Sequence, residues 1–216
     1  SMWTTDNNHG AQLQFHTGRH MLEGNFPTIG SWVHYGLGSL NDNLPQFISL
    51  GKREYWNNKD GHYLGPAHDA VPITVDPRNP LNYGKPEKDL SHAEQKVGFD
   101  LVGKLNKLRA VEYPDDPALE ARIKAYELAF RMQTSVPEAL KFDSESAATR
   151  KLYGLDDPGT ANFGRQCLLA RRFAERGVRF VQVTHSDSMV QWDQHSGLKQ
   201  GHEKNANEVD RPIAGL

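Results

Sequence analysis

The sequence has little of several features that define common protein classes. It contains one cysteine, Cys167, in 216 residues, so an intrachain disulfide and a cysteine-based zinc site are both excluded. Its 25 Lys and Arg nearly balance 27 Asp and Glu, and the formal charge of −2 lacks the basic excess of nucleic-acid-binding proteins. No run approaches the roughly 18 apolar residues of a membrane-spanning helix. We therefore expect no nucleic-acid partner and no membrane span.

The length and composition suit one folded domain. A chain of 216 residues is close to the roughly 100–200 residues of a single domain. Apolar residues make up 37%, which indicates a globular protein with much irregular, polar chain. We expect one domain over residues 1–216 with three zones: a loop-rich zone at 1–90, a helical zone at 91–176, and a strand with a polar loop at 177–216.

Capping residues predict two helices in the middle zone. Ser91 with Glu94 matches a capping box ahead of a helix that reaches about Ala110. Pro117 suits the first position of a second helix, with Asp116 as its N-cap. Both helices are therefore expected to begin at residues whose side chains satisfy free backbone N–H groups.

A helix followed by a strand is expected near the C-terminal end. The helix should open at Asp157-Pro158 and close at Gly177 in a left-handed cap. One face of this helix should be buried, with Phe163, Cys167, Ala170 and Ala174 on it, so we interpret Cys167 as helix core rather than as a nucleophile. The apolar run 178–184 predicts a strand, and the helix–Gly–strand order indicates an αβ unit. A polar loop should follow at 185–201, and a last helix near Glu203.

The polar loop after the strand contains a candidate metal site. Asp193 and His195 offer an oxygen and a nitrogen donor two residues apart, and His202 could add a second nitrogen. Ligands of open α/β sheets gather at the carboxyl ends of the strands. Carboxylate plus imidazole suits zinc, manganese or a similar divalent ion. An Asp-x-His pair also occurs in solvated turns, so both interpretations stay open.

The polar run from Thr4 to Gly10 has two interpretations. Thr, Asp and Asn cap helix N-termini by accepting backbone N–H bonds, which would account for the composition. The same geometry allows chemistry, because a hydroxyl at a helix N-terminus lies in positive potential beside N–H groups that can hold an anion. With a metal to lower its pKa, Thr5 could attack phosphorus or sulfur.

Several runs, in order along nearly the whole chain, carry a specific resemblance. They are residues 5–10 with Thr17-Gly18, 30–33 with 35–38, 64–67, 119–123 with 126–133, 163–172 with 177–183, Trp192-Asp193-x-His195, and 201–206. Together they resemble a bacterial family of sulfatase-like proteins, the domain-of-unknown-function family 1501. That family is similar in turn to the alkaline phosphatase superfamily.

The resemblance implies a fold, a site and a chemistry. The fold would be a partial alkaline phosphatase-like α/β fold, with a mostly parallel sheet flanked by helices. Thr5 would stand in the nucleophile position, four residues before His9, and Asn8 would assist the anion. Asp193 and His195, with His202 added, would ligate divalent metal ions (Zn, Mn, Ca or Mg). The substrate would be a small-molecule phosphate or sulfate ester, and the location exported or periplasmic.

The resemblance also has departures. The family's upstream metal-binding aspartate and its Gly-Glu-Phe-Gly-Arg and Arg-Asp-His runs do not occur in this chain. The resemblance therefore implies a fragment lacking both ends, with an incomplete and inactive site, unless a homo-oligomer completes it. An alternative is a non-catalytic binding or structural protein on the same scaffold, with residues 1–90 forming a glycan- or protein-binding face. A generic α/β domain with an incidental Asp-x-His loop is the third possibility.

Overall fold

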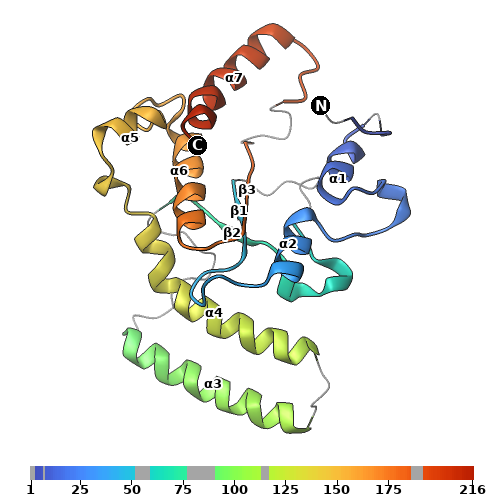
Figure 1. Ribbon diagram of the computed structural model, residues 1–216, viewed down its shortest axis with the longest axis vertical. Coiled ribbons are helices and arrows are strands. Elements are labelled where there is room, and N and C mark those ends of the chain that lie inside the picture. The colour runs from blue at the N-terminus through green and yellow to red at the C-terminus, as the bar shows by residue number, and fades with distance from the viewer. Residues whose placement is uncertain (1–2, 7, 52–58, 77–90, 113–116, 186–191) are drawn as a thin grey trace.

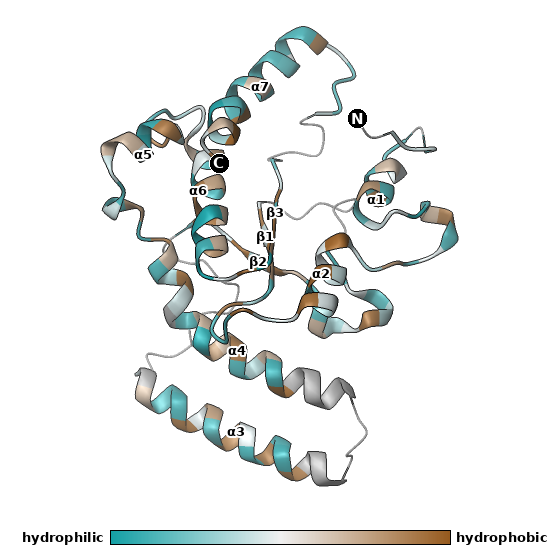
Figure 2. Cartoon of the chain, viewed as in Figure 1, coloured by the Kyte–Doolittle hydropathy of each residue, from teal (hydrophilic) through white to brown (hydrophobic). Residues whose placement is uncertain are grey.

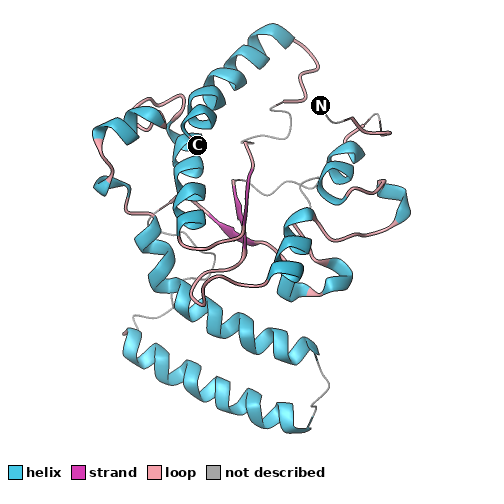
Figure 3. Cartoon of the chain, viewed as in Figure 1, coloured by secondary structure: helices cyan, strands magenta, loops and turns pink. Residues whose placement is uncertain are grey.

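The chain folds around a small parallel β-sheet. The computed structural model describes residues 3–6, 8–51, 59–76, 91–112, 117–185 and 192–216. The strands in these ranges pair in the order β2-β1-β3, with β1 at Phe47–Leu50, β2 at Val71–Ile73 and β3 at Phe180–Val183. Both pairings are parallel, and Ile48 lies opposite Val71 on one side and Val181 on the other. Helices flank the sheet (Figure 3), so the predicted α/β class is confirmed.

The helices lie on both sides of this sheet. They are α1 Gly10–Thr17, α2 Ile29–Leu37, α3 His92–Glu112, α4 Pro117–Ala139, α5 Ala147–Leu152, α6 Ala161–Glu175 and α7 Leu198–Gly215. Short 3-10 turns occur at Met21–Glu23, His62–Leu64, Pro66–His68 and Phe142–Ser144. Figure 1 shows α6 and α7 on one side of the strands and α1 and α2 on the other. The arrangement is thus three layers, helix–sheet–helix.

The central strand is buried along its whole length. Every residue of β1 is buried, because α6 covers one face of the sheet and α2 covers the other. A nearly continuous apolar strand is typical of a parallel sheet that is covered on both faces. Gly30 of α2 lies against the ring of Phe47, and a Cβ at Gly30 would collide with that ring. The absence of a side chain at Gly30 therefore lets α2 approach β1 closely.

Helix α6 supplies much of the hydrophobic core. Leu168, Leu169 and Phe173 are fully buried in the same cluster as Ile48 and Leu50 of β1. Burying a side chain of this size contributes about 1.5–3 kcal/mol. The cluster extends to α4, β2 and the turn after α5 through Val136, Ile73 and Tyr153. The core thus joins the sheet to helices from the whole second half of the chain.

One face of α6 is buried, largely as predicted. Phe163, Cys167 and Ala170 lie in the core, whereas Ala174 is exposed, so its predicted place on the buried face was wrong. Cys167 is 1% exposed, and burial raises the pKa of its thiol to about 11. A thiol with so high a pKa is neutral and unreactive near pH 7. The interpretation of Cys167 as helix core is therefore confirmed.

The predicted capping of α3 and α4 agrees with the structure where it is described. The Ser91 N–H donates to Glu94 Oε2 at 2.9 Å, and the Glu94 N–H donates to Ser91 Oγ at 3.3 Å, which completes the capping box. The helix continues to Glu112, slightly past the predicted end. Helix α4 begins at Pro117 as predicted, while its expected N-cap, Asp116, lies outside the described residues.

The helix starts near the C-terminal end differ from the prediction. Helix α6 begins at Ala161 rather than at Asp157, and the Ala161 N–H donates to the Asp157 carbonyl of the preceding turn at 2.8 Å. Helix α7 begins at Leu198 instead of near Glu203, directly after Gly197 in a left-handed conformation with φ of 61°. The polar loop is therefore shorter than predicted.

Helices α3 and α4 form a hairpin that projects from the sheet (Figure 1). The last part of α4 reaches the core, where Met132 is 3% exposed and Val136 fully buried. Helix α3 packs along α4 and lies farther from the sheet. Although these helices are long, none in the described ranges is both long and apolar enough to cross a bilayer.

Candidate functional site

The polar run before α1 folds into a compact turn. The Thr4 hydroxyl donates to the Asp6 carbonyl at 2.7 Å, and the Asn8 N–H donates to Asp6 Oδ1 at 3.2 Å. The other carboxylate oxygen of Asp6 lies 3.3 Å from His20 Nε2. Asp6 therefore ties the turn to the chain that follows α1, and His9 becomes the first residue ahead of the helix.

Trp192 is the centre of a set of contacts near the carboxyl end of β3. Its indole N–H donates to His185 Nδ1 at 3.0 Å, so the His185 ring must carry a proton on Nε2, which lies 3.0 Å from Glu208 Oε2 of α7. His202 stacks on the indole with ring centroids 6.1 Å apart, and its Nε2 lies 3.3 Å from the Trp192 carbonyl. These contacts join the end of β3 to α7 and hold the neighbouring Asp193 in place.

The two polar segments meet at Asp193. His9 Nε2 lies 3.2 Å from Asp193 Oδ2, and His195 Nε2 lies 3.1 Å from the same oxygen. A pocket of about 340 Å³ adjoins this cluster and is lined by Asn8, His9, Gln12, Trp192 and Asp193. His9 and Asp193 are each about 40% exposed, and contacts at such exposure contribute little to stability. The cluster is therefore better suited to binding than to holding the fold.

The predicted site residues differ in their relation to this pocket. Asn8 lines it, and Asp193 and His195 contact one another beside it. His202 is directed to Trp192 instead. The Thr5 hydroxyl bonds the side-chain amide of Gln14 at 3.2 Å, and Thr5 is exposed and not part of the lining. The structure thus brings the polar run before α1 into contact with Asp193 through His9. The catalytic and metal-binding roles of the predicted site residues stay predictions.

The donor atoms around Asp193 suit a divalent cation in type. A tetrahedral ion with bonds of roughly 2.0–2.2 Å spaces its ligands about 3.3–3.6 Å apart, slightly more than the 3.2 Å and 3.1 Å distances at Asp193 Oδ2. Among the residues that the structure describes, however, no group of three or more His, Cys, Asp or Glu side chains is arranged to hold a metal ion. His9, Asp193 and His195 therefore provide the right ligand chemistry, but not a complete ligand group.

Two residues of the cluster were not among the predicted site residues. His9 is the side chain that links the N-terminal run to Asp193, and its spacing from Thr5 was the one signal pointing to it. His185 lies two residues after β3, and a place near the carboxyl end of a strand is itself a signal in a parallel sheet. Neither contact could be found from local sequence, because the partners are far apart along the chain.

A larger cavity of about 560 Å³ lies beside β2 and the middle of α4, and a histidine pair lines it. The rings of His34 and His68 lie 4.6 Å apart, and the Nδ1 atom of each has no hydrogen-bond partner within the described part of the chain. Burial lowers the pKa of His34, and the neighbouring His68 lowers it further. Burial also lowers the pKa of His68, partly offset by the Asp69 carboxylate. The pair is therefore neutral in the folded protein near pH 7.

This pair makes the folded state sensitive to mild acid. Because its folded pKa values lie below the ordinary 6.5, the unfolded chain takes up protons first as the pH falls. We expect the Tm to fall by a few degrees between about pH 7.5 and pH 5.5 and the fall to be shallower in His34→Asn. Burial raises the pKa of the Asp69 carboxyl, which acts with the opposite sign at lower pH.

Differential scanning calorimetry in the presence of a chelator measures this effect. His195→Asn is the matched control, because it removes a histidine whose side chain is 80% exposed. An unaltered slope in His34→Asn would show that other groups cause the pH dependence.

The fold and site define a three-layer α/β protein with a polar cluster near the carboxyl end of a parallel strand. Over residues 1–216, the chain matches the family described as "Protein of unknown function (DUF1501)". The match spans the whole chain, so the protein belongs to this family, as the sequence resemblance implied. No curated protein and no solved structure matches the chain.

Proposed function

We propose that the protein is a sulfatase-like member of the alkaline phosphatase superfamily, whose His9–Asp193 cluster belongs to a metal-dependent site for phosphate or sulfate esters. The observation that carries the proposal is the 3.2 Å contact between His9 and Asp193, which unites two polar segments from opposite ends of the chain. A pocket adjoins this contact. The position after β3 supports the proposal, because sites of parallel α/β sheets lie at the carboxyl ends of strands.

The residues of the cluster suit the steps that ester hydrolysis requires. Asp193, His195 and His9 would supply part of the ligand group of a divalent ion, which when bound polarises the ester and lowers the pKa of a nucleophile. Asn8 and the start of α1 face the pocket region, and the positive end of a helix favours an anionic group there. The chain thereby offers separate groups for the cation and for the anion.

Thr5 is the proposed nucleophile, and its hydroxyl must first leave Gln14. Its Oγ would lose a proton to solvent and bond to phosphorus or sulfur as the bond to the ester oxygen breaks. The leaving alcohol would take a proton from water. A second water would then cleave the Thr5 ester and release inorganic phosphate or sulfate. This sequence predicts a covalent intermediate on Thr5.

Metal binding tests the proposal without requiring turnover. We expect calorimetric titration with Zn²⁺ or Mn²⁺ to show binding that Asp193→Asn weakens by more than about 10-fold, because the loss of even an outer-shell partner of a ligand weakens metal binding by about 10- to 100-fold. Where the chain hydrolyses aryl phosphates or sulfates, Thr5→Ala should remove the activity and leave the metal affinity unchanged. Asp42→Asn, at an exposed carboxylate elsewhere, is the matched control. Equal metal affinity in the native chain and Asp193→Asn would contradict the proposal.

A non-catalytic binding protein is the second candidate, favoured by one observation. Trp32, Tyr35 and Tyr63 expose 44%, 59% and 64% of their surface, and the Trp32 ring contacts each tyrosine ring edge to face at 6.0 Å. Clustered exposed aromatic rings mark binding surfaces for glycans or proteins. A chain that binds no divalent ion but loses glycan binding in Trp32→Ala would favour this candidate over the hydrolase.

A further inference from the structure

Glu208 of α7 is a carboxylate that turns inward, toward the chain beyond β3. Its Oε2 lies 3.0 Å from His185 Nε2, and the two side chains are only 21% and 12% exposed. Figure 2 shows α7 as hydrophilic along much of its length, and Glu203 on the same helix is 61% exposed. Glu208 therefore differs from its neighbour by giving up most of its contact with water for a contact with one imidazole ring.

Both ring nitrogens of His185 are engaged by neighbouring side chains. The indole N–H of Trp192 can only donate, so His185 Nδ1 accepts it at 3.0 Å and holds no proton. The neutral ring then carries its proton on Nε2 and donates it to Glu208. The ring of Phe163 packs against the imidazole edge to face, with centroids 5.0 Å apart. His185 has no nitrogen left for a metal ion, so it connects Glu208 to Trp192 and is not itself a ligand.

We propose that Glu208 is a positioning residue for the candidate metal site: it keeps His185 in the Nε2–H tautomer, which holds Trp192 and thereby Asp193. The inference rests on the proposed function, because it concerns Asp193 as a metal ligand. Carboxylates near metal sites fix the tautomer and ring orientation of histidines in the same way. Without the carboxylate, either ring nitrogen can carry the proton, and a ring protonated on Nδ1 cannot accept the Trp192 N–H.

Trp192 transmits the effect of the tautomer to Asp193. Its indole N–H is held by His185, and its backbone carbonyl lies 3.3 Å from His202 Nε2. Asp193 is the next residue, lines the same pocket as Trp192, and contacts His9 at 3.2 Å. An indole without its acceptor is free to rotate, and the Asp193 carboxylate then loses its fixed place beside His9.

Direct attraction of a cation by the Glu208 charge is the competing explanation, and two substitutions separate it from positioning. Oε2 is directed to His185, and Oε1 lies 3.9 Å from Lys204 Nζ, which offsets part of the negative charge. Glu208→Gln removes the charge but keeps a carbonyl oxygen that can accept the Nε2 proton. Glu208→Leu removes both the charge and the acceptor. Positioning predicts that only the leucine variant disturbs the site, whereas attraction predicts that both do.

Nuclear magnetic resonance tests the tautomer without a metal ion. The chain has four tryptophans, so the indole signal lost in Trp192→Phe belongs to Trp192, and the imidazole signals lost in His185→Asn belong to His185. At mildly alkaline pH, where imidazole is neutral, long-range proton–nitrogen spectra should show the Nε2–H tautomer in the native chain and in Glu208→Gln. Glu208→Leu should show both tautomers and faster exchange of the Trp192 indole proton with solvent. An unchanged tautomer and indole signal in Glu208→Leu would overturn the proposal.

Calorimetric titration with Zn²⁺ tests the consequence for the metal site, at the binding step that Asp193→Asn weakens. We expect Glu208→Leu to bind Zn²⁺ about 10- to 100-fold more weakly than the native chain, the loss typical of an outer-shell partner, and Glu208→Gln to keep the native affinity. Equal weakening in both variants would assign the effect to charge and overturn the proposal. A native chain that binds no Zn²⁺ would count against the proposed function, while the tautomer would still decide the role of Glu208.

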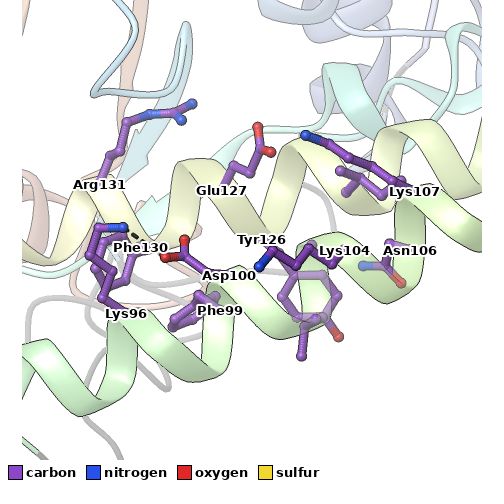
Figure 4. A pocket seen from close by; sticks show the side chains of 13 residues that line it. Lys96, Phe99, Asp100, Lys104, Asn106, Lys107, Tyr126, Glu127, Phe130 and Arg131 are labelled. Atoms are coloured by element: carbon purple, nitrogen blue, oxygen red, sulfur yellow. Dashed lines mark hydrogen bonds and ion pairs between the residues drawn. The ribbon is translucent and has the colours of Figure 1, made fainter.

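Two glutamates elsewhere provide matched controls for both measurements. Glu203→Leu removes an exposed carboxylate from the same helix. Glu127→Leu removes one from α4, where Figure 4 shows Glu127 beside a cavity of about 490 Å³ between α3 and α4. Neither variant should change the His185 tautomer, the Trp192 indole signal or the Zn²⁺ affinity. A loss of Zn²⁺ affinity in Glu203→Leu as large as in Glu208→Leu would show that the charge of α7 matters and not the contact with His185, which would overturn the proposal.

Discussion

Replacing Arg172 with leucine is expected to lower the free energy of unfolding by about 3 kcal/mol, the loss typical of a broken buried ion pair. The Arg172 side chain is 8% exposed and lies 2.7 Å from Glu145 Oε1. It also donates to the Ala139 carbonyl at 2.6 Å and to the Lys141 carbonyl at 3.2 Å. Without the guanidinium, these acceptors at the end of α4 lose their donor. Arg171, 3.4 Å from Glu145, keeps part of the charge compensation.

Thermal unfolding measures the effect, and two further variants define it. A loss of about 3 kcal/mol corresponds to a Tm lower by roughly 6–12 °C in a chain of this size. Arg165→Leu removes the same charge from an exposed position on the same helix and should change the Tm little. The double variant Arg172→Leu/Glu145→Leu should recover part of the loss, because no unpaired carboxylate remains. A double variant no more stable than Arg172→Leu would show that the carbonyl contacts, and not the ion pair, dominate.

Replacing Gly51 with alanine is expected to destabilise the protein by at least about 2 kcal/mol, since two costs act at this position. Gly51 directly follows β1 and has φ of 99°, a conformation that L side chains rarely adopt. A Cβ there would also collide with the carbonyl oxygen of Thr184, which follows β3. The Thr184 N–H donates to the Leu50 carbonyl at 2.9 Å, so the collision falls where the two strands are paired.

Chemical denaturation checks this result, with Gly36→Ala as the control. Gly36 lies in α2, and a Cβ there meets nothing within 4 Å. Alanine is favoured over glycine in a helix by up to about 1 kcal/mol, so this variant should be neutral or more stable. If Gly51→Ala were as stable as Gly36→Ala, the close approach of the chain after β3 to Gly51 would not require glycine at this position.

The Gly51 substitution also concerns the candidate site. The substitution would disturb the chain after β3 at Thr184. The next residue is His185, whose ring accepts the Trp192 N–H at 3.0 Å. Trp192 directly precedes Asp193 and lines the same pocket. A shift at the carboxyl end of β3 would therefore reach Asp193 through one hydrogen bond. Weaker metal binding in Gly51→Ala would link the sheet edge to the site.

Local sequence determined the features that depend on neighbouring residues. The capping box of Ser91 and Glu94 and the start of α4 at Pro117 follow from backbone N–H groups that nearby atoms satisfy. The cap at Gly177 is of the same kind, with φ of 86° and the Val178 N–H donating to the Phe173 carbonyl at 3.0 Å. The starts of α6 at Ala161 and of α7 at Leu198 have no such pattern, and their predicted positions were wrong.

The strands of the loop-rich zone show where local patterns become insufficient. β1 and β2 are short, and no periodic run distinguishes them from the surrounding polar chain. β1 is stable because β2 and β3 pair with both of its edges and helices cover both faces. Those partners lie elsewhere along the chain, so tertiary contacts and not propensity determine these strands.

By itself, the sequence determined the α/β class, the helix caps, the buried character of Cys167 and the family. Only the tertiary structure decided that His9 lies 3.2 Å from Asp193, that Thr5 contacts Gln14, and that His202 turns to Trp192. The reason is physical. A cap is formed by atoms a few residues apart, whereas the candidate site forms when the parallel strands bring distant segments to one end of the sheet.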